Sequence, residues 1–185
     1  MSKGIAMSAS DVMAFWKDAG PEKWFDKDAQ FDATFHDRFR DLHFTAARRE
    51  LETWLETAED SLALLLLLLL DQFPRNCFRG TAHMYATDPL ARHYTQEVLR
   101  RGHDKTIDPE LRIFLYLSLM HSEDLEDQHL CCKLCEPLGE RYLPFAIEHR
   151  DIIERFGRFP HRNEVLLRKS TADEKRFLEE GGFAG

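Results

Sequence analysis

The sequence predicts an all-α protein, built as stacked helical hairpins or as an irregular bundle of eight or nine helices. Leucine occurs 25 times, whereas valine and isoleucine together occur nine times. Leucine favours helices, and the β-branched residues favour strands. Nine glycines and seven prolines are few helix breakers for 185 residues, which favours long elements over many turns. Apolar residues also recur every three or four positions, as on the buried face of an amphipathic helix.

The first half of the chain is expected to form two amphipathic helices that lead into a buried one. Phe31, Phe35 and Phe39 are spaced by four residues, and residues 51–62 continue a helical rhythm. The wholly apolar run over residues 62–70 is far shorter than the roughly 20 residues that cross a bilayer. This run therefore predicts a buried helix and not a membrane span.

Capping signals place the next helices. Asp88 and Asp108 each precede a proline, so each is expected to be the N-cap of a helix. The first of these helices should end at Gly102, because glycine readily adopts the left-handed conformation found after a helix. Ser122 is expected to cap the helix that follows them.

The last helices are predicted from apolar spacing and from one capping box. Leu130, Leu134 and Leu138 share one face of the helix that Ser122 would cap. A helix over about residues 142–156 should direct Phe145 into the core as well. Thr171 and the glutamate three residues later form a capping box, which predicts a short terminal helix.

Composition limits the classes of function. The chain carries 25 basic and 33 acidic residues, a net charge of −8 that opposes general adhesion to nucleic acid or to an anionic membrane. We therefore expect neither as a partner, and we predict no cofactor. Residues 1–7 lack the apolar stretch of a secretory signal, so a cytoplasmic location and reduced cysteines are expected. The length predicts a single domain over residues 1–185.

Familiar catalytic templates are absent from the sequence. It contains no G-x-S-x-G nucleophile elbow, no phosphate-binding loop and no dinucleotide-binding glycine motif. Cys131 and Cys135 would share a helical face and could form half of a metal site. The remaining ligands are missing, so buried thiols are the favoured interpretation.

Six short segments carry a family resemblance. They are residues 71–76 (DQFPRN), 78–82 (FRGTA), 86–91 (ATDPLA), 120–125 (MHSEDL), 149–153 (HRDII) and 156–163 (FGRFPHRN). Together they resemble the bacterial DUF924 family over about residues 11–180. The resemblance implies a tetratricopeptide-like helical fold and no established activity. The sequence departs from the family pattern at residues 17–19 and in the cysteine cluster at 131–135.

The family-like segments contain ten polar residues that we expect to converge in one pocket. The ligand-binding candidates are Arg75, Asn76, Arg79, Arg158, His161 and Arg162, and the catalytic candidates are His121, Glu123, His149 and Asp151. Guanidinium groups suit the recognition of phosphate or carboxylate, and imidazoles with carboxylates can relay a proton near neutral pH. The pocket would therefore serve a binding or scaffold protein that takes a small anion or an acidic peptide end.

Three other interpretations stay open. The same polar groups often pair with each other and with helix ends in compact helical proteins, which would give them a structural role. A hydrolase, in contrast, would pair one of the two catalytic histidines with a carboxylate and use an arginine to stabilise charge. A purely structural interaction module is the third. His149 falls on the apolar face of its helix, so its imidazole is expected to be buried.

Overall fold

The computed structural model confirms the all-α fold class. It describes residues 7–24, 28–68, 73–78 and 80–184, and these contain nine α-helices, five short 3₁₀ helices and no strand. The chain divides into two compact units. Unit 1 comprises residues 1–79 and 83–118, and unit 2 comprises residues 80–82 and 119–185. The tetratricopeptide-like arrangement and the single domain stay predictions.

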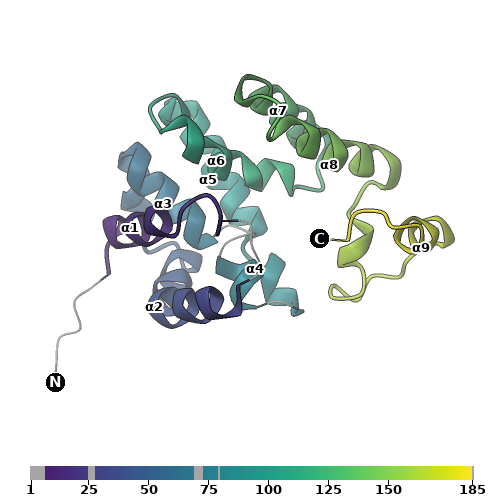
Figure 1. The fold of residues 1–185 in the computed structure, drawn as a ribbon, viewed down its shortest axis with the longest axis horizontal. Helices are drawn as coiled ribbons and strands as arrows, with labels where there is room; N and C mark the ends of the chain where they lie inside the picture. The colour runs from purple at the N-terminus through teal and green to yellow at the C-terminus, as the bar shows by residue number, and fades with distance from the viewer. Residues whose placement is uncertain (1–6, 25–27, 69–72, 79, 185) are drawn as a thin grey trace. The chain divides into compact units, whose positions relative to one another are not determined.

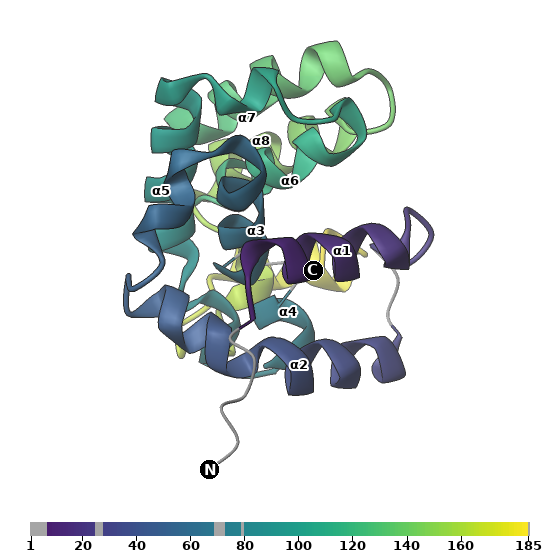
Figure 2. The same ribbon diagram turned by 90° about the vertical axis from the view of Figure 1, so that its left-hand side faces the viewer.

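Unit 1 is organised around a buried leucine helix. Its elements are α1 (Ala9–Ala19), α2 (Ala29–Ala47), η1 (Glu52–Glu56), α3 (Ala58–Leu68), α4 (Phe73–Cys77), most of η2 (Ala82–Tyr85), α5 (Asp88–Arg101), η3 (His103–Lys105) and most of α6 (Pro109–Met120). Helix α3 packs against α1, α2 and α5 (Figures 1 and 2). Residues 62–66 are fully buried, as predicted for the apolar run, and residues 69–70 lie outside the described part.

An aromatic cluster fills the core between α1, α2 and α6. Trp16 stacks on Trp24, and both rings meet the edge of Phe114 at centroid distances of 5.3 and 5.2 Å. Phe35 and Phe39 are fully buried, as their spacing predicts. The Nε1–H of Trp24 donates to the backbone oxygen of Trp16 at 2.7 Å, which joins the loop after α1 to the end of that helix.

The predicted helix over residues 51–62 is wrong as a continuous element. Thr57 adopts an extended conformation and separates η1 from α3. Its hydroxyl accepts a hydrogen bond from the backbone N–H of Asp60 at 3.1 Å, which is an N-cap interaction. A threonine that caps a new helix competes with continuation of the old one, and apolar spacing alone does not register that competition.

The capping predictions for α5 and α6 are partly confirmed. Asp108 accepts from the backbone N–H of Glu110 at 3.0 Å, and Gly102 ends α5 with a φ of 73°. Asp88, however, is the first residue of α5 and not its N-cap, which is Thr87. The predicted cap of α5 therefore lies one residue too late.

Unit 2 contains the end of α6, α7 (Leu125–Cys135), η4 (Glu136–Leu138), α8 (Leu143–Phe156), η5 (Pro160–Arg162) and α9 (Ala172–Glu179). Helices α7 and α8 pack side by side (Figure 1). The core of unit 2 contains Ile152 and Ile153 from α8 together with Phe159. Phe177 and Phe183 pack against this core. The capping box at the start of α9 is confirmed.

Two sequence predictions about α7 and α8 are wrong, namely the cap at Ser122 and the burial of Phe145. Asp124 caps α7 in place of Ser122, because its carboxylate accepts from the N–H of the second helical residue at 2.9 Å. Leu130 is 37% exposed, whereas the buried face of α7 carries Cys131. Phe145 is 56% exposed. The buried face of α7 is therefore the cysteine side, about 100° from Leu130, whereas α8 buries His149 as predicted and leaves Phe145 exposed.

Within the described ranges, no helix is long and apolar enough to cross a bilayer.

Candidate functional site

Five of the ten predicted site residues gather near Phe159 in unit 2. They form a group that we call the Phe159 cluster, which consists of His121, Glu123, His149, His161 and Arg162. The imidazoles of His149 and His161 lie 5.5 and 5.6 Å from the phenyl ring of Phe159, measured between ring centroids. The guanidinium carbon of Arg162 lies 4.4 Å from the centroid of the same ring. The ring of His121 lies 5.4 Å from the ring of His149. Residues 121 and 161 thus come together although they lie 40 positions apart in the sequence.

Arg162 brings a buried positive charge into the cluster. It belongs to the 3₁₀ turn η5, and the residue is only 5% exposed. Its Nη2 donates to the backbone oxygen of His121 at 3.0 Å, and its guanidinium lies over the face of Phe159. The aromatic face and the carbonyl oxygen both stabilise the cation, which explains how it is tolerated inside the unit.

Glu123 ties the loop before α7 to the segment after α8. Its carboxylate accepts two hydrogen bonds from Arg168, at 2.6 and 2.9 Å, and one from the backbone N–H of Phe159 at 2.8 Å. Burial opposes ionisation, but these donors outweigh it and hold the pKa of Glu123 below its usual value. Both carboxylate oxygens are therefore engaged by the protein itself. Arg168 lies outside the family-like segments, and nothing in its local sequence distinguishes it.

His149 has one ring nitrogen bonded and the other not. The residue is 4% exposed, which confirms the predicted burial. Its Nδ1 lies 2.8 Å from the backbone oxygen of Phe145, so Nδ1 must carry the hydrogen. Its buried Nε2 has no hydrogen-bond partner among the residues that the structure describes. Burial, together with the positive charge of Arg162, lowers the pKa of His149 to about 4. At neutral pH Nε2 is therefore an unprotonated acceptor.

Arg158 connects α9 to the rest of unit 2. Its guanidinium donates to both oxygens of Glu174, at 2.6 and 2.9 Å, and to the backbone oxygen of Lys169 at 2.9 Å. Glu174 is only 2% exposed, and it also accepts from the N–H of Thr171 in the capping box. The hydrogen bond from Arg158 lowers the pKa of Glu174 to about 2. The pair of Arg158 and Glu174 therefore has a structural role, because each satisfies the other and a neighbouring backbone group.

The remaining predicted residues lie elsewhere. Asp151 is exposed and pairs with Arg150 at 2.6 Å. Arg75 belongs to unit 1, where it donates to the backbone oxygen of Met84 and lies 3.5 Å from the carboxylate of Asp88. The side chain of Asn76 and the whole of Arg79 lie outside the described residues.

The segment after α9 covers the Phe159 cluster. The ring of Phe183 lies 4.6 Å from that of His149 and 5.2 Å from that of His161. Gly182 makes this approach possible, because a Cβ atom at that position would lie 2.5 Å from the ring of Phe177. Phe183 lies beyond the family-like segments, and sequence reasoning did not find it.

Comparison with known proteins identifies the family. A family model described as "Bacterial protein of unknown function (DUF924)" matches residues 12–182. The chain belongs to the DUF924 family. The solved structure of a protein of unknown function from Agrobacterium tumefaciens is similar to this DUF924 chain, with 65% sequence identity and a TM-score of 0.90. The match covers 94% of this chain and 97% of that one. No curated protein matches the sequence.

The geometry of this DUF924 protein lends no support to the predicted hydrolase. His149 donates to a backbone carbonyl and not to a carboxylate, and the oxygens of Glu123 accept from Arg168 and from a backbone N–H. A general base needs a partner that orients it, and a carboxylate oxygen held by an arginine is poorly placed for that role. In the described part of the chain, no three histidine, cysteine or acidic residues are grouped so as to hold a metal ion.

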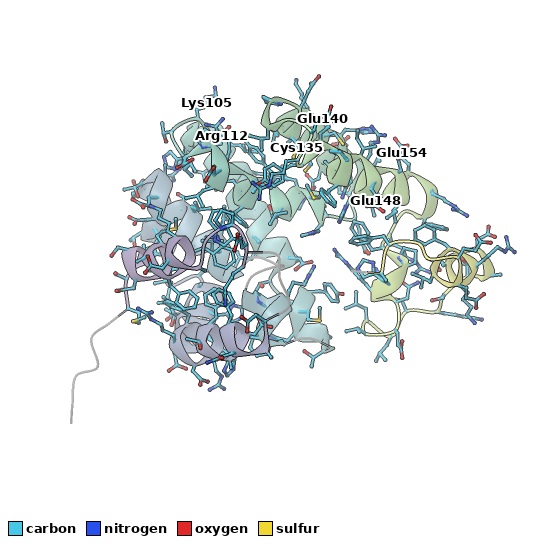
Figure 3. The ribbon with its side chains drawn as sticks, in the orientation of Figure 1. Lys105, Arg112, Cys135, Glu140, Glu148 and Glu154 are labelled. Carbon is cyan, nitrogen blue, oxygen red and sulfur yellow. The ribbon has the colours of Figure 1, made fainter. Side chains whose placement is uncertain are left out.

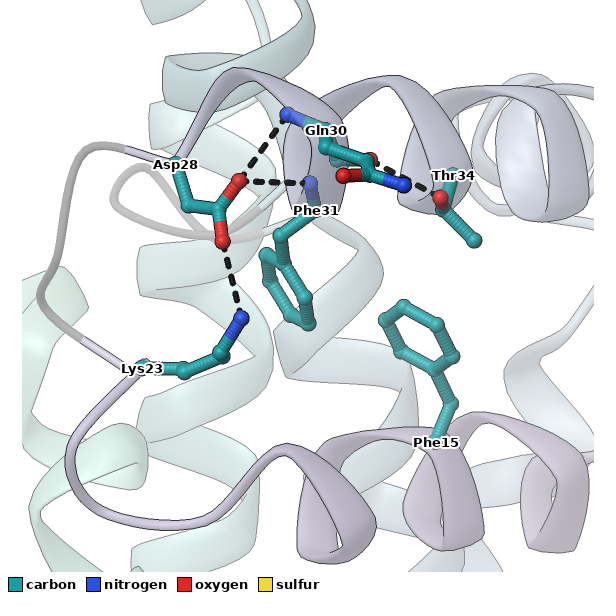
Figure 4. A pocket seen from close by; sticks show the side chains of 6 residues that line it. All are labelled: Phe15, Lys23, Asp28, Gln30, Phe31 and Thr34. Atoms are coloured by element: carbon teal, nitrogen blue, oxygen red, sulfur yellow. Dashed lines mark hydrogen bonds and ion pairs between the residues drawn. The ribbon is translucent and has the colours of Figure 1, made fainter.

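A hollow lies in unit 1 of the DUF924 protein, between α1 and the start of α2. It has a volume of about 320 Å³, and its lining consists of Phe15, Lys23, Asp28, Gln30, Phe31 and Thr34 (Figure 4). Lys23 pairs with the carboxylate of Asp28 at 2.8 Å, and the same carboxylate caps α2. The two charges at this hollow are therefore already matched. No motif in the sequence pointed to it.

Proposed function

We propose that this DUF924 protein binds a small oxyanion that carries a hydroxyl hydrogen, with inorganic phosphate as the simplest example, at the Phe159 cluster. The observation that carries the proposal is the buried Nε2 of His149, which has a lone pair and no hydrogen-bond partner within the described ranges. A buried acceptor without a donor costs free energy, on the order of 1–3 kcal/mol. A ligand that donates a hydrogen bond to Nε2 removes this unfavourable contribution.

The charges around the cluster favour an anion. Arg168 and Glu123 neutralise each other through their paired hydrogen bonds. Arg162 adds a further positive charge, which acts on both His149 and Glu123 and shifts the pKa of each downward. These three charged groups sum to one positive charge in a largely dehydrated environment, where attraction to an anion is stronger than in water. Guanidinium groups also match the geometry of oxyanions.

The protonation state of His149 makes the site selective. Because its pKa is about 4, the imidazole is neutral at pH 7 and cannot donate from Nε2. Phosphate retains at least one P–OH near neutral pH, because the loss of its second proton, at a pKa of roughly 6–7, still leaves the third proton in place. Sulfate has the same tetrahedral shape but no hydrogen to donate, and the carboxylate of an acidic peptide end has none either. The site therefore favours phosphate over both.

Entry to the site requires movement of one side chain. Phe183 lies directly on His149 and His161, and its residue is only half-buried. The segment that holds it follows the short helix α9 and contains two successive glycines, Gly181 and Gly182. Such a segment can open locally without unfolding the unit, because glycine permits many backbone conformations and Phe183 is not fully buried. A ligand reaches Nε2 of His149 when the ring of Phe183 swings away.

Phosphate is expected to raise the thermal stability of the protein, whereas sulfate at the same ionic strength is not. A hundredfold excess of ligand over its Kd stabilises the native state by about 2.7 kcal/mol. His149→Phe keeps an aromatic ring of similar size but removes Nε2, so the stabilisation by phosphate should vanish. Thermal unfolding monitored by circular dichroism, with millimolar phosphate or sulfate, measures both effects.

His129→Phe is the matched control. His129 lies on α7 with 56% of its side chain exposed, so this variant makes the same chemical change away from the cluster and should respond to phosphate as the wild type does. Equal stabilisation by sulfate, no stabilisation of the wild type by phosphate, or an undiminished response in His149→Phe would each contradict the proposal.

A further inference from the structure

Helix α7 brings two buried sulfur atoms together. Cys131 and Cys135 are one helical turn apart, both are fully buried, and their Sγ atoms lie 3.9 Å from each other. Both are thiols and not partners in a disulfide. Cys135 is the last residue of α7 (Figure 3). This pair plays no part in the Phe159 cluster or in the proposed binding of phosphate.

We propose that Cys131 and Cys135 bind one monovalent copper ion between their two thiolates. Thiolate is the soft ligand that selects Cu(I). With the zinc–thiolate length of about 2.3 Å as a guide, two collinear metal–sulfur bonds span about 4.6 Å. The observed separation of the sulfurs is about 0.7 Å short of that span, a difference that small rotations about the Cα–Cβ bonds supply.

The number of ligands argues for Cu(I) over other metals. Structural zinc takes four protein ligands, and catalytic zinc takes three. The residues that the structure describes contain no group of three histidines, cysteines or acidic residues that could hold a metal ion. Cys132 follows Cys131 directly, so its side chain leaves the helix about 100° away and is partly exposed. Two sulfurs in a dry environment suit an ion that is satisfied by two ligands.

Binding exchanges protons for the metal without a change in oxidation state. The two thiols lose one proton each, two Cu–S bonds form, and the product is a bis-thiolate Cu(I) centre with a net charge of −1. The hydrogen bond between the sulfurs raises the pKa of Cys131 and lowers that of Cys135. The pair therefore releases its first proton more easily than its second.

The position of Cys135 provides a route for the ion. After it come the 3₁₀ turn Glu136–Leu138 and Gly139, whose φ is 79°. Helix ends open more readily than helix centres, because their last carbonyl groups lack partners within the helix. Opening of this final turn exposes Cys135 first, and the ion then reaches Cys131 one turn deeper.

An anaerobic titration tests the site. Cu(I) held by the coloured chelator bicinchoninate is offered to the purified, reduced protein, and loss of colour reports transfer. We expect one equivalent to be bound. Cys131→Ser and Cys135→Ser should each weaken the affinity at least tenfold. The matched controls Cys132→Ser and Cys77→Ser should retain wild-type affinity, because their sulfurs lie outside the pair.

A spectroscopic measurement on the wild-type protein covers the case in which a serine variant fails to fold. X-ray absorption of the copper-loaded protein should show two sulfur neighbours and no nitrogen or oxygen neighbour. Full retention of binding in both Cys131→Ser and Cys135→Ser, loss of binding in Cys132→Ser, or a nitrogen or oxygen ligand at the metal would each overturn the proposal.

Discussion

Replacement of Trp16 by alanine is expected to lower the free energy of unfolding by about 4 kcal/mol. Trp16 is completely buried, stacks on Trp24 and meets the edge of Phe114. The substitution removes a large apolar side chain from the centre of unit 1 and leaves a cavity that its rigid aromatic neighbours cannot fill. Urea unfolding monitored by circular dichroism measures the loss.

Phe145→Ala is the control for the effect of burial. It also converts a large aromatic residue to alanine, but Phe145 is 56% exposed, so we expect a loss below about 0.5 kcal/mol. The backbone oxygen of Phe145 that accepts from His149 is retained in this variant. Comparable losses in the two variants would show that Phe145 is buried, as the apolar spacing predicts, and would contradict its observed exposure.

The second large effect is expected at Glu174. Its pKa in the folded protein is about 2, below the ordinary value of 4.5, because Arg158 donates to its carboxylate. A carboxyl group with a lowered pKa stabilises the fold above its unfolded pKa and loses that contribution as the pH falls through its folded pKa. Glu174→Gln should therefore cost about 2 kcal/mol at pH 7, less than the full shift implies because Arg158 is partly solvated.

The pH dependence distinguishes this charge effect from simple loss of packing. The difference in stability between wild type and Glu174→Gln should be constant above about pH 5 and should shrink between about pH 4.5 and 2. Asp173→Asn removes the same charge from the neighbouring exposed position, where 68% of the side chain is accessible, and should change stability little. Urea unfolding at a series of pH values measures the difference, and a pH-independent difference would contradict our assignment.

Local signals in the sequence predicted several helix boundaries. Asp108, Gly102 and Thr171 each act within one turn of their own position, through a hydrogen bond or a backbone preference that needs no distant partner. The prediction failed at Thr57, where a cap and a continuing apolar rhythm competed. It also placed the caps of α5 and α7 at the wrong neighbouring residues, because several adjacent side chains can serve as caps.

The choice of buried face was less predictable. Helix α7 carries leucines on one side and cysteines on the next, and either side could have packed inward. In the structure α7 packs against α8, and the side of α7 that carries the cysteines is the buried one. In α8 the predicted face is only partly buried, because His149 is inside as expected and Phe145 is exposed. A helix with apolar residues on more than one side does not specify its own rotation, since burial depends on its neighbours.

The sequence by itself determined that this chain is helical, that it belongs to the DUF924 pattern and that His149 faces inward, because composition, motifs and helical spacing are local properties. Only the tertiary structure decided which polar groups meet. Three residues that contact predicted site residues lie outside every family-like segment. Arg168 donates to Glu123, and Glu174 accepts from Arg158. Phe183 packs against His149. Contacts between distant segments depend on how the helices pack, and the spacing of residues along one helix does not predict that packing.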